Sequence, residues 1–105
     1  TVYMAAFKVT TLRLSEETVE ELEDLTRRLR REKSDVMREA MRIGIEEMKL
    51  RLALELYSKG EISFGRAAEI TSLGYRELNL ELRKRNIPFR YGEERFRDEA
   101  KQLVG

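Results

Sequence analysis

The stretch Lys8-Val9-Thr10-Thr11-Leu12-Arg13-Leu14-Ser15 decides the fold that the sequence predicts. It is rich in β-branched residues, and its side chains alternate between two faces. Leu12 and Leu14 share one face, while Val9, Thr11 and Arg13 share the other. A period of two is typical of a β-strand that buries one of its faces. We therefore predict a strand over residues 8–14.

The predicted strand leads directly into a strong helix signal. Ser15 is a good N-cap residue, and the glutamates that follow it suit the positive end of a helix dipole. Arginines occupy the last turn, where the dipole is negative. The apolar positions recur at helical spacing and are Val19, Leu22, Leu25 and Leu29. We predict a helix over residues 16–30.

A second, longer helix is predicted from Ser34, as its N-cap, to Ser58. No proline interrupts this stretch, so it forms either one rod or two helices joined near residues 49–52. The stripe that we expect to be buried contains Val36, Met37, Ala40, Met41, Ile45 and Met48. Methionines at helical spacing are typical of ordinary core packing.

The remainder of the chain predicts shorter helices separated by turns. They are expected after the N-cap Ser63, over residues 75–85 and over residues 93–103, with a C-cap at Gly60, a break at 71–74 and a stop at Pro88. The predicted fold class is mainly α with one N-terminal β-strand. We divide it into a domain over residues 8–49 and a second over residues 52–105.

The predicted strand has no long partner within its own chain. A lone strand would leave its backbone donors and acceptors unpaired. Two copies of the chain can pair residues 8–14 as an antiparallel ribbon, which leaves Val9, Thr11 and Arg13 of each chain outward. A two-stranded ribbon fits the major groove of B-DNA, where these side chain types can contact base edges. We therefore expect a homodimer, or a higher oligomer, that binds double-stranded DNA.

The start of the second helix is the predicted phosphate site. The backbone N–H groups of Ser34, Asp35 and Val36 have no expected partner within the helix and would form an anion site. Arg31, Lys33 and Ser34 are the expected phosphate contacts, although the carboxylate of Asp35 opposes an anion. The alternative for the basic run over residues 27–33 is compensation of the first helix's dipole on a solvated surface.

In its order of elements, the first half resembles the ribbon-helix-helix DNA-binding family of the Arc, MetJ and CopG type. The matching residues are Thr11-Leu12-Arg13-Leu14-Ser15-Glu16-Glu17, Val19, Leu22, Leu25, Lys33-Ser34 and Val36-Met37-Arg38-Glu39-Ala40. The resemblance implies an intertwined dimer, base contacts by Val9, Thr11 and Arg13, and phosphate contacts by Lys33 and Ser34. This chain departs from the family by placing Arg30 or Arg31 where a glycine usually joins the helices.

The second half resembles a small, uncharacterised prokaryotic family whose members are often predicted to be antitoxins. The matching runs are 53–57, Lys59-Gly60-Glu61-Ile62-Ser63, Arg66-Ala67-Ala68-Glu69, Tyr75-Arg76-Glu77-Leu78 and Ile87-Pro88. Its middle is helix-turn-helix-like, with Ser72 in the place of the usual turn glycine.

The last helix of that motif offers a possible second DNA or partner surface. Its exposed face is expected to carry Arg76, Asn79 and Arg83. Glu77 and Glu81 would repel phosphate, so contact with a protein is the favoured interpretation. Residues 87–91 are a candidate edge for β-augmentation by a partner.

Composition excludes several functional classes. The absence of cysteine and histidine removes disulfides, Cys/His zinc sites and histidine proton transfer, so we expect neither an enzyme nor a cofactor. A formal net charge of +1 argues against a bulk polycation, so DNA binding requires local basic patches. Scarce Asn and Gln beside abundant Glu and Arg are typical of proteins from hot environments.

Neither a signal peptide nor an apolar run near the ~18 residues of a membrane span is evident, so we expect a soluble cytoplasmic protein. The favoured function is that of a homodimeric, sequence-specific repressor. The first alternative is an antitoxin that binds a toxin protein through its C-terminal module and represses its own operon. The second is an interaction protein that dimerises without binding DNA.

Overall fold

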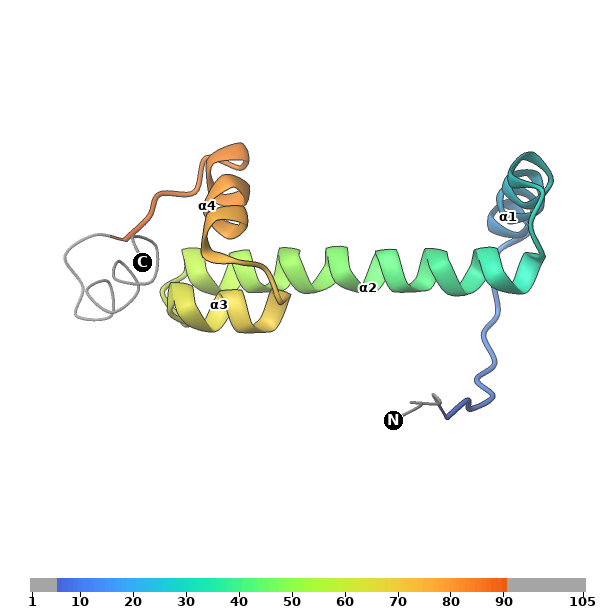
Figure 1. The fold of residues 1–105 in the computed structure, drawn as a ribbon, viewed down its shortest axis with the longest axis horizontal. Helices are drawn as coiled ribbons and strands as arrows, with labels where there is room; N and C mark the ends of the chain where they lie inside the picture. The colour runs from blue at the N-terminus through green and yellow to red at the C-terminus, as the bar shows by residue number, and fades with distance from the viewer. Residues whose placement is uncertain (1–5, 91–105) are drawn as a thin grey trace. The chain divides into compact units, whose positions relative to one another are not determined.

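The structure is a computed structural model that describes residues 6–90 (Figure 1). These residues form four helices: α1 (Glu16–Leu29), α2 (Lys33–Ser58), α3 (Phe64–Thr71) and α4 (Tyr75–Lys84). They contain no β-strand, so this part of the chain is all-α. The helix predicted over residues 93–103 lies outside the described residues. The chain divides into an N-terminal unit, Thr1–Ala40, and a C-terminal unit, Met41–Gly105.

The segment that precedes α1 has no regular secondary structure. Residues 6–15 are all exposed, and the side chain of Leu12, expected to face a core, is 66% exposed. The predicted strand over residues 8–14 is therefore wrong for one chain by itself. The physical reason is that a strand makes its hydrogen bonds to a neighbouring strand, and residues 6–90 supply none.

Helix α1 begins and ends by local rules that the sequence predicts. The Oγ of Ser15 accepts a hydrogen bond from the backbone N–H of Thr18 at 3.1 Å, which confirms the predicted N-cap. The helix ends one residue earlier than predicted because Arg30 adopts the left-handed conformation, with φ 54° and ψ 46°. The N–H groups of Arg30 and Arg31 then bond to the carbonyls of Arg27 and Thr26, respectively. Arginine thus occupies a conformation that usually favours glycine.

Helix α2 is one continuous helix, which settles the choice between one rod and two helices. It begins at Lys33, so Ser34 lies inside the first turn and is not the N-cap that we predicted. The N–H of Val36 donates to the carbonyl of Glu32 at 3.1 Å, so the prediction that this N–H is free is also wrong. The left-handed Arg30 reverses the chain so tightly that only Arg31 and Glu32 separate it from the first residue of α2. Helix α2 therefore begins earlier than the predicted N-cap at Ser34 would allow.

The stripe that we expected α2 to bury is largely uncovered in one chain. Val36 is buried, whereas Met37, Ala40, Met41, Ile45 and Met48 are exposed. The pattern does predict a helix face that is apolar. It does not specify whether the covering atoms belong to the same chain.

The C-terminal unit has a core of its own, in which α3 and α4 pack on the last turns of α2 (Figure 1). The buried side chains are Ala53, Leu54, Tyr57, Phe64, Ala67, Ala68, Leu78 and Leu82. The ring of Phe64 lies at the centre, with its centroid 5.8 Å from that of Tyr57, 5.4 Å from Tyr75 and 4.8 Å from Phe89.

The turns of the C-terminal unit lie where the sequence predicts them. Gly60 has φ +77° after the end of α2, and the Oγ of Ser63 accepts the N–H of Arg66 at 3.0 Å to cap α3. Ser72 is left-handed with φ 58°, and Gly74 is the N-cap of α4. Ser72 therefore takes the turn conformation for which the helix-turn-helix pattern usually has glycine.

Candidate nucleic-acid interface

Val9, Thr11 and Arg13 all lie in the exposed segment before α1. The side chain of Val9 is 95% exposed, and none of the three side chains makes a hydrogen bond or ion pair within residues 6–90. Their base-contacting role stays a prediction, because it requires the second strand. The three side chains are accessible for contact with another molecule.

The residues predicted to contact phosphate differ in whether their side chains already have an ion-pair partner. Lys33 and Ser34 are exposed in the first turn of α2, where backbone N–H groups lack carbonyl partners four residues earlier within the helix. The carboxylate of Asp35 forms an ion pair with Arg38 at 3.0 Å, which reduces the electrostatic repulsion between Asp35 and a bound anion. Arg31 is paired with Glu39, so a phosphate would have to displace that carboxylate. Lys33 is the stronger candidate.

Arg76, Asn79 and Arg83 lie on one face of α4, at spacings of three and four residues. The opposite face packs Leu78 and Leu82 into the core. Arg76 and Arg83 are exposed and make no ion pair among the described residues. The structure therefore brings these three predicted residues together on one face, with the half-buried Asn79 between the two exposed arginines.

An ion-pair network joins α4 to α2 within the C-terminal unit. Arg85 is hydrogen-bonded to Glu81 and lies 3.5 Å from the carboxylate of Glu47, while Lys84 lies 3.3 Å from Glu81. The hydrogen bond from Arg85 holds the pKa of Glu81 below its ordinary value, and partial burial opposes this shift. The sequence analysis missed the network, because residues 47 and 85 are far apart in the chain.

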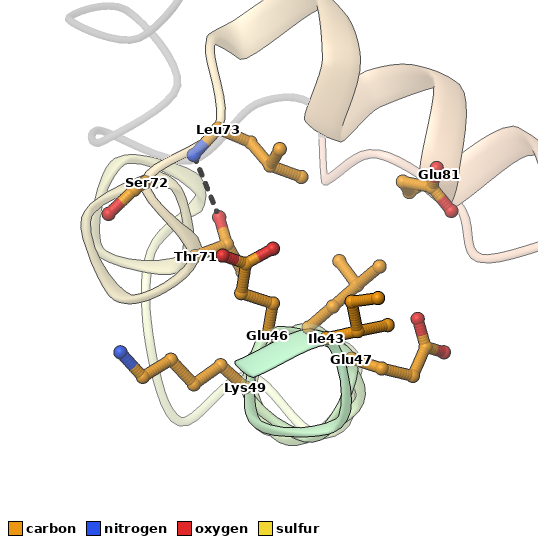
Figure 2. Close-up of a pocket in the computed structure, with 9 residues that line it drawn as sticks. Ile43, Glu46, Glu47, Lys49, Thr71, Ser72, Leu73 and Glu81 are labelled. Carbon is orange, nitrogen blue, oxygen red and sulfur yellow. Dashed lines mark hydrogen bonds between the residues drawn. The ribbon is translucent and has the colours of Figure 1, made fainter. Parts of the chain in front are cut away.

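An open hollow of about 390 Å³ lies beside this network (Figure 2). Its lining is Ile43, Glu46, Glu47, Lys49, Leu50, Thr71, Ser72, Leu73 and Glu81. The hydroxyl of Thr71 is engaged by the backbone, donating to Ala67 at 2.9 Å and accepting from Leu73 at 3.3 Å. Within residues 6–90 no three acidic, cysteine or histidine side chains gather closely enough to hold a metal ion.

Arg90 is a structural residue that the sequence analysis missed. Its guanidinium lies 3.9 Å from the centroid of the Tyr57 ring and donates to the carbonyls of Tyr57 and of Ile62, the latter at 2.6 Å. Its backbone N–H donates to the Tyr57 hydroxyl at 3.0 Å. These contacts join residues about 30 positions apart, so no local sequence pattern predicts them.

The proposed β-augmentation edge is partly occupied. The N–H of Ile87 donates to Leu82 at 2.9 Å, and that of Arg90 is bonded to Tyr57. These two donors are not available to a partner strand, so the expectation of an open edge is wrong for them. Tyr91 lies outside the described residues.

Comparison with known proteins identifies the family. A family model described as "Uncharacterised protein family (UPF0175)" matches residues 8–104. The chain belongs to this family. A UPF0175 protein of Archaeoglobus fulgidus is 48% identical over 60 residues, which cover 57% of this chain and 68% of that protein. No solved structure matches the chain significantly.

The sequence analysis assigned the two halves of the chain to two different families, whereas the family match covers both halves. The resemblance to a small uncharacterised family is confirmed, but UPF0175 begins at residue 8 and includes α1 and α2 as well as the C-terminal half. The ribbon-helix-helix resemblance of residues 8–48 stays a prediction. No helix within residues 6–90 has both the length and the apolar character needed to cross a bilayer.

Proposed function

We propose that the protein is a homodimeric, sequence-specific DNA-binding repressor that reads the major groove with an intersubunit β-ribbon. The observation that carries this proposal is the incomplete burial of the N-terminal unit. Helix α1 has an apolar face but no buried residue, and the strand-patterned segment before it has no strand partner among residues 6–90. One molecule of the same chain could supply both missing surfaces.

The energetic argument starts with α1. A helix of 14 residues is marginal in water unless its apolar face is packed. In one chain Leu29 is 46% exposed and Leu25 is 43% exposed. Antiparallel pairing of residues 8–14 would satisfy the backbone groups and direct Leu12 and Leu14 toward a shared core. Burial of these side chains from both copies would then stabilise α1.

The same pairing would form the DNA-reading surface. Val9, Thr11 and Arg13 would point outward from both strands into the major groove, where arginine pairs with guanine edges and threonine and valine contact thymine methyl groups. Lys33 and Ser34 would contact the phosphates on either side. Arg31 would contribute less while Glu39 remains its partner. The ribbon would supply sequence specificity through base contacts, and the phosphate contacts at the start of α2 would hold the ribbon in register on the DNA.

An antitoxin is the second candidate, and an apolar stripe on α2 favours it. The stripe contains Met41, Ile45, Met48 and Leu52, all exposed, at spacings of four, three and four residues. That spacing is typical of a seam between two helices. A captured toxin would cover the stripe while the ribbon represses the operon. Co-purification of the full chain with the product of a neighbouring nuclease gene would support this candidate.

A gel-shift experiment tests the proposed reader. The probe is the DNA upstream of the protein's own gene, and the variant is Thr11→Ala with Arg13→Ala. We expect specific binding to weaken by at least tenfold, since a good base contact is worth about 1–3 kcal/mol. Arg51→Ala is the matched control, because Arg51 is an exposed arginine outside the basic run over residues 27–33 and is paired with Glu47 at 3.1 Å. Equal binding by the ribbon variant and the control would refute the assignment.

Two further measurements test the dimer and the phosphate site. Lys33→Ala should weaken binding to all sequences alike and reduce the slope of affinity against salt. Sedimentation of the full chain should show a dimer at micromolar concentration. A monomer at that concentration would contradict the intersubunit ribbon.

A further inference from the structure

We propose that α4 carries a second DNA-binding surface, separate from the ribbon and made of Arg76, Asn79, Leu80 and Arg83. We call it the α4 surface. The sequence argued against DNA here because Glu77 and Glu81 share the helix. The positions of these two carboxylates in the structure weaken that objection.

The α4 surface is presented to solvent by a firmly held helix. Leu78 is fully buried and Leu82 is 1% exposed, so α4 is fixed on the core by its opposite face. Leu80 is 52% exposed and lies four residues after Arg76, on the same side. The two arginines of the surface are exposed and make no ion pair within the described residues.

Glu81 faces away from the α4 surface. Its carboxylate is bonded by Arg85 and Lys84 and lines the hollow next to α2, as Figure 2 shows. Because two cations already neutralise it, Glu81 contributes little repulsion to an anion on the opposite side of the helix.

Glu77 is folded back over the beginning of α4. A Cβ atom built on Gly74 would overlap Oε2 of Glu77 and lie 3.2 Å from its Cδ. The carboxylate therefore lies against the helix N-terminus, where the dipole stabilises it. Phosphate is consequently excluded from that N-terminus, and the arginines are the groups left to contact the DNA.

The chemistry of the α4 surface fits double-stranded DNA. Arginine can form bidentate hydrogen bonds with guanine, asparagine with adenine, and an exposed leucine can pack on a thymine methyl group. With its side chains a helix such as α4 is about 10–12 Å across, which suits a major groove about 12 Å wide. Helix α3 and the left-handed Ser72 precede it, so the second helix of the pair offers its outer face, as in DNA-reading helix-turn-helix motifs.

The test is DNA binding by the full chain with Arg76→Ala and Arg83→Ala together. The control is Arg51→Ala with Arg66→Ala, which removes the same charge from exposed, ion-paired arginines of the C-terminal unit. On the DNA upstream of the protein's own gene, we expect the α4 variant to bind at least tenfold more weakly than the control. Its salt slope should fall by about 2 for each chain that contacts DNA.

Footprinting on the same DNA separates this surface from the ribbon. The α4 variant should lose protection at one part of the site, and the Thr11→Ala, Arg13→Ala variant should lose it at another. Equal affinity and an equal footprint for the α4 variant and its control would overturn the proposal, whatever the ribbon variant does. Loss of binding to an acidic protein, with DNA binding unchanged, would also overturn it. Circular dichroism of both variants verifies that the helices are intact.

Discussion

The N-terminal and C-terminal units use the same local devices but differ in how they bury their apolar side chains. Both contain amphipathic helices, a serine N-cap and a left-handed residue after a helix. The C-terminal unit surrounds Phe64 with side chains from three helices, whereas Val36 is the buried apolar residue of the described N-terminal unit. The comparison shows that one unit has an aromatic core within a single chain, whereas the other leaves its apolar side chains largely uncovered, which is the basis of the proposed dimer.

The largest effect should come from the core of the C-terminal unit. Phe64→Ala removes a fully buried ring in contact with three other aromatic rings. We expect a loss of about 3–5 kcal/mol in the free energy of unfolding, measured by urea denaturation. The loss should be independent of protein concentration. A change below about 1 kcal/mol would show that this core does not stabilise the unit.

The N-terminal unit should respond to concentration instead. Leu25→Ala should cost about 2 kcal/mol for each chain in the dimer, because the proposed dimer would bury Leu25 against a second copy of the chain. The measurement is helicity by circular dichroism across a dilution series, in which the variant loses helix at higher concentration than the wild type. Leu80→Ala is the control, since Leu80 lies on α4. Helicity that does not depend on concentration in either protein would break the comparison.

Arg90→Ala tests whether the segment after α4 completes the C-terminal unit. The change removes the guanidinium bonds to the carbonyls of Tyr57 and Ile62 and the contact with the Tyr57 ring. We expect a loss of about 2 kcal/mol in unfolding free energy. Arg90→Lys should recover little of it, because an ammonium group cannot reproduce the planar, bidentate geometry. Wild-type stability in both variants would contradict the role of Arg90.

A matched pair of glycine substitutions sharpens the comparison. Arg30 and Ser72 are both left-handed, with φ 54° and 58°, so Arg30→Gly and Ser72→Gly should each relieve about 1 kcal/mol of backbone strain. Ser72→Gly should raise the unfolding free energy at any protein concentration. Arg30→Gly should stabilise only concentrated, dimeric samples. Identical behaviour of the two variants on dilution would argue that both units fold alone.

The smallest effect concerns pH. The folded pKa of Glu81 is lowered, chiefly by the hydrogen bond from Arg85, so its ion pair stabilises the fold above the unfolded carboxylate's pKa of about 4.3. That contribution disappears as the pH falls through the lower folded pKa. Glu81→Gln should therefore be less stable than the wild type at pH 7, and the difference should shrink by pH 3. A difference that stays constant in urea titrations at both pH values would contradict this.

Local rules explain why much of the fold was predictable. The caps at Ser15 and Ser63 and the turns at Gly60 and Ser72 depend on a few neighbouring residues, and the structure has them where the sequence predicts them. The core residues of α3 and α4 followed from helical spacing. The prediction of Ser34 as an N-cap was wrong because the left-handed Arg30 shortens the connection between α1 and α2. An arginine in the sequence does not indicate a left-handed conformation, so the length of this connection could not be predicted.

Other features depend on atoms that are distant in the chain. The contacts of Arg90 with Tyr57 and of Arg85 with Glu47 arise only after α2, α3 and α4 have packed. Periodicity marked the α2 stripe around Met41 as apolar but could not say which molecule covers it. Helical spacing already places Leu80 on the same face as Arg76, four residues earlier. The sequence did not show that the carboxylates of Glu77 and Glu81 lie away from this face, so it did not single out Leu80.

The aromatic core has a practical consequence for spectroscopy. The chain has no tryptophan, and Tyr57 and Tyr75, the tyrosines among residues 6–90, both contact Phe64. Rings held in fixed packing give a near-ultraviolet dichroic signal that vanishes when the packing is lost, whereas the far-ultraviolet signal follows helix content everywhere. The signal of these two rings is therefore an intrinsic label for the C-terminal unit. Recording both spectral regions in one titration would separate the melting of the two units without any added dye.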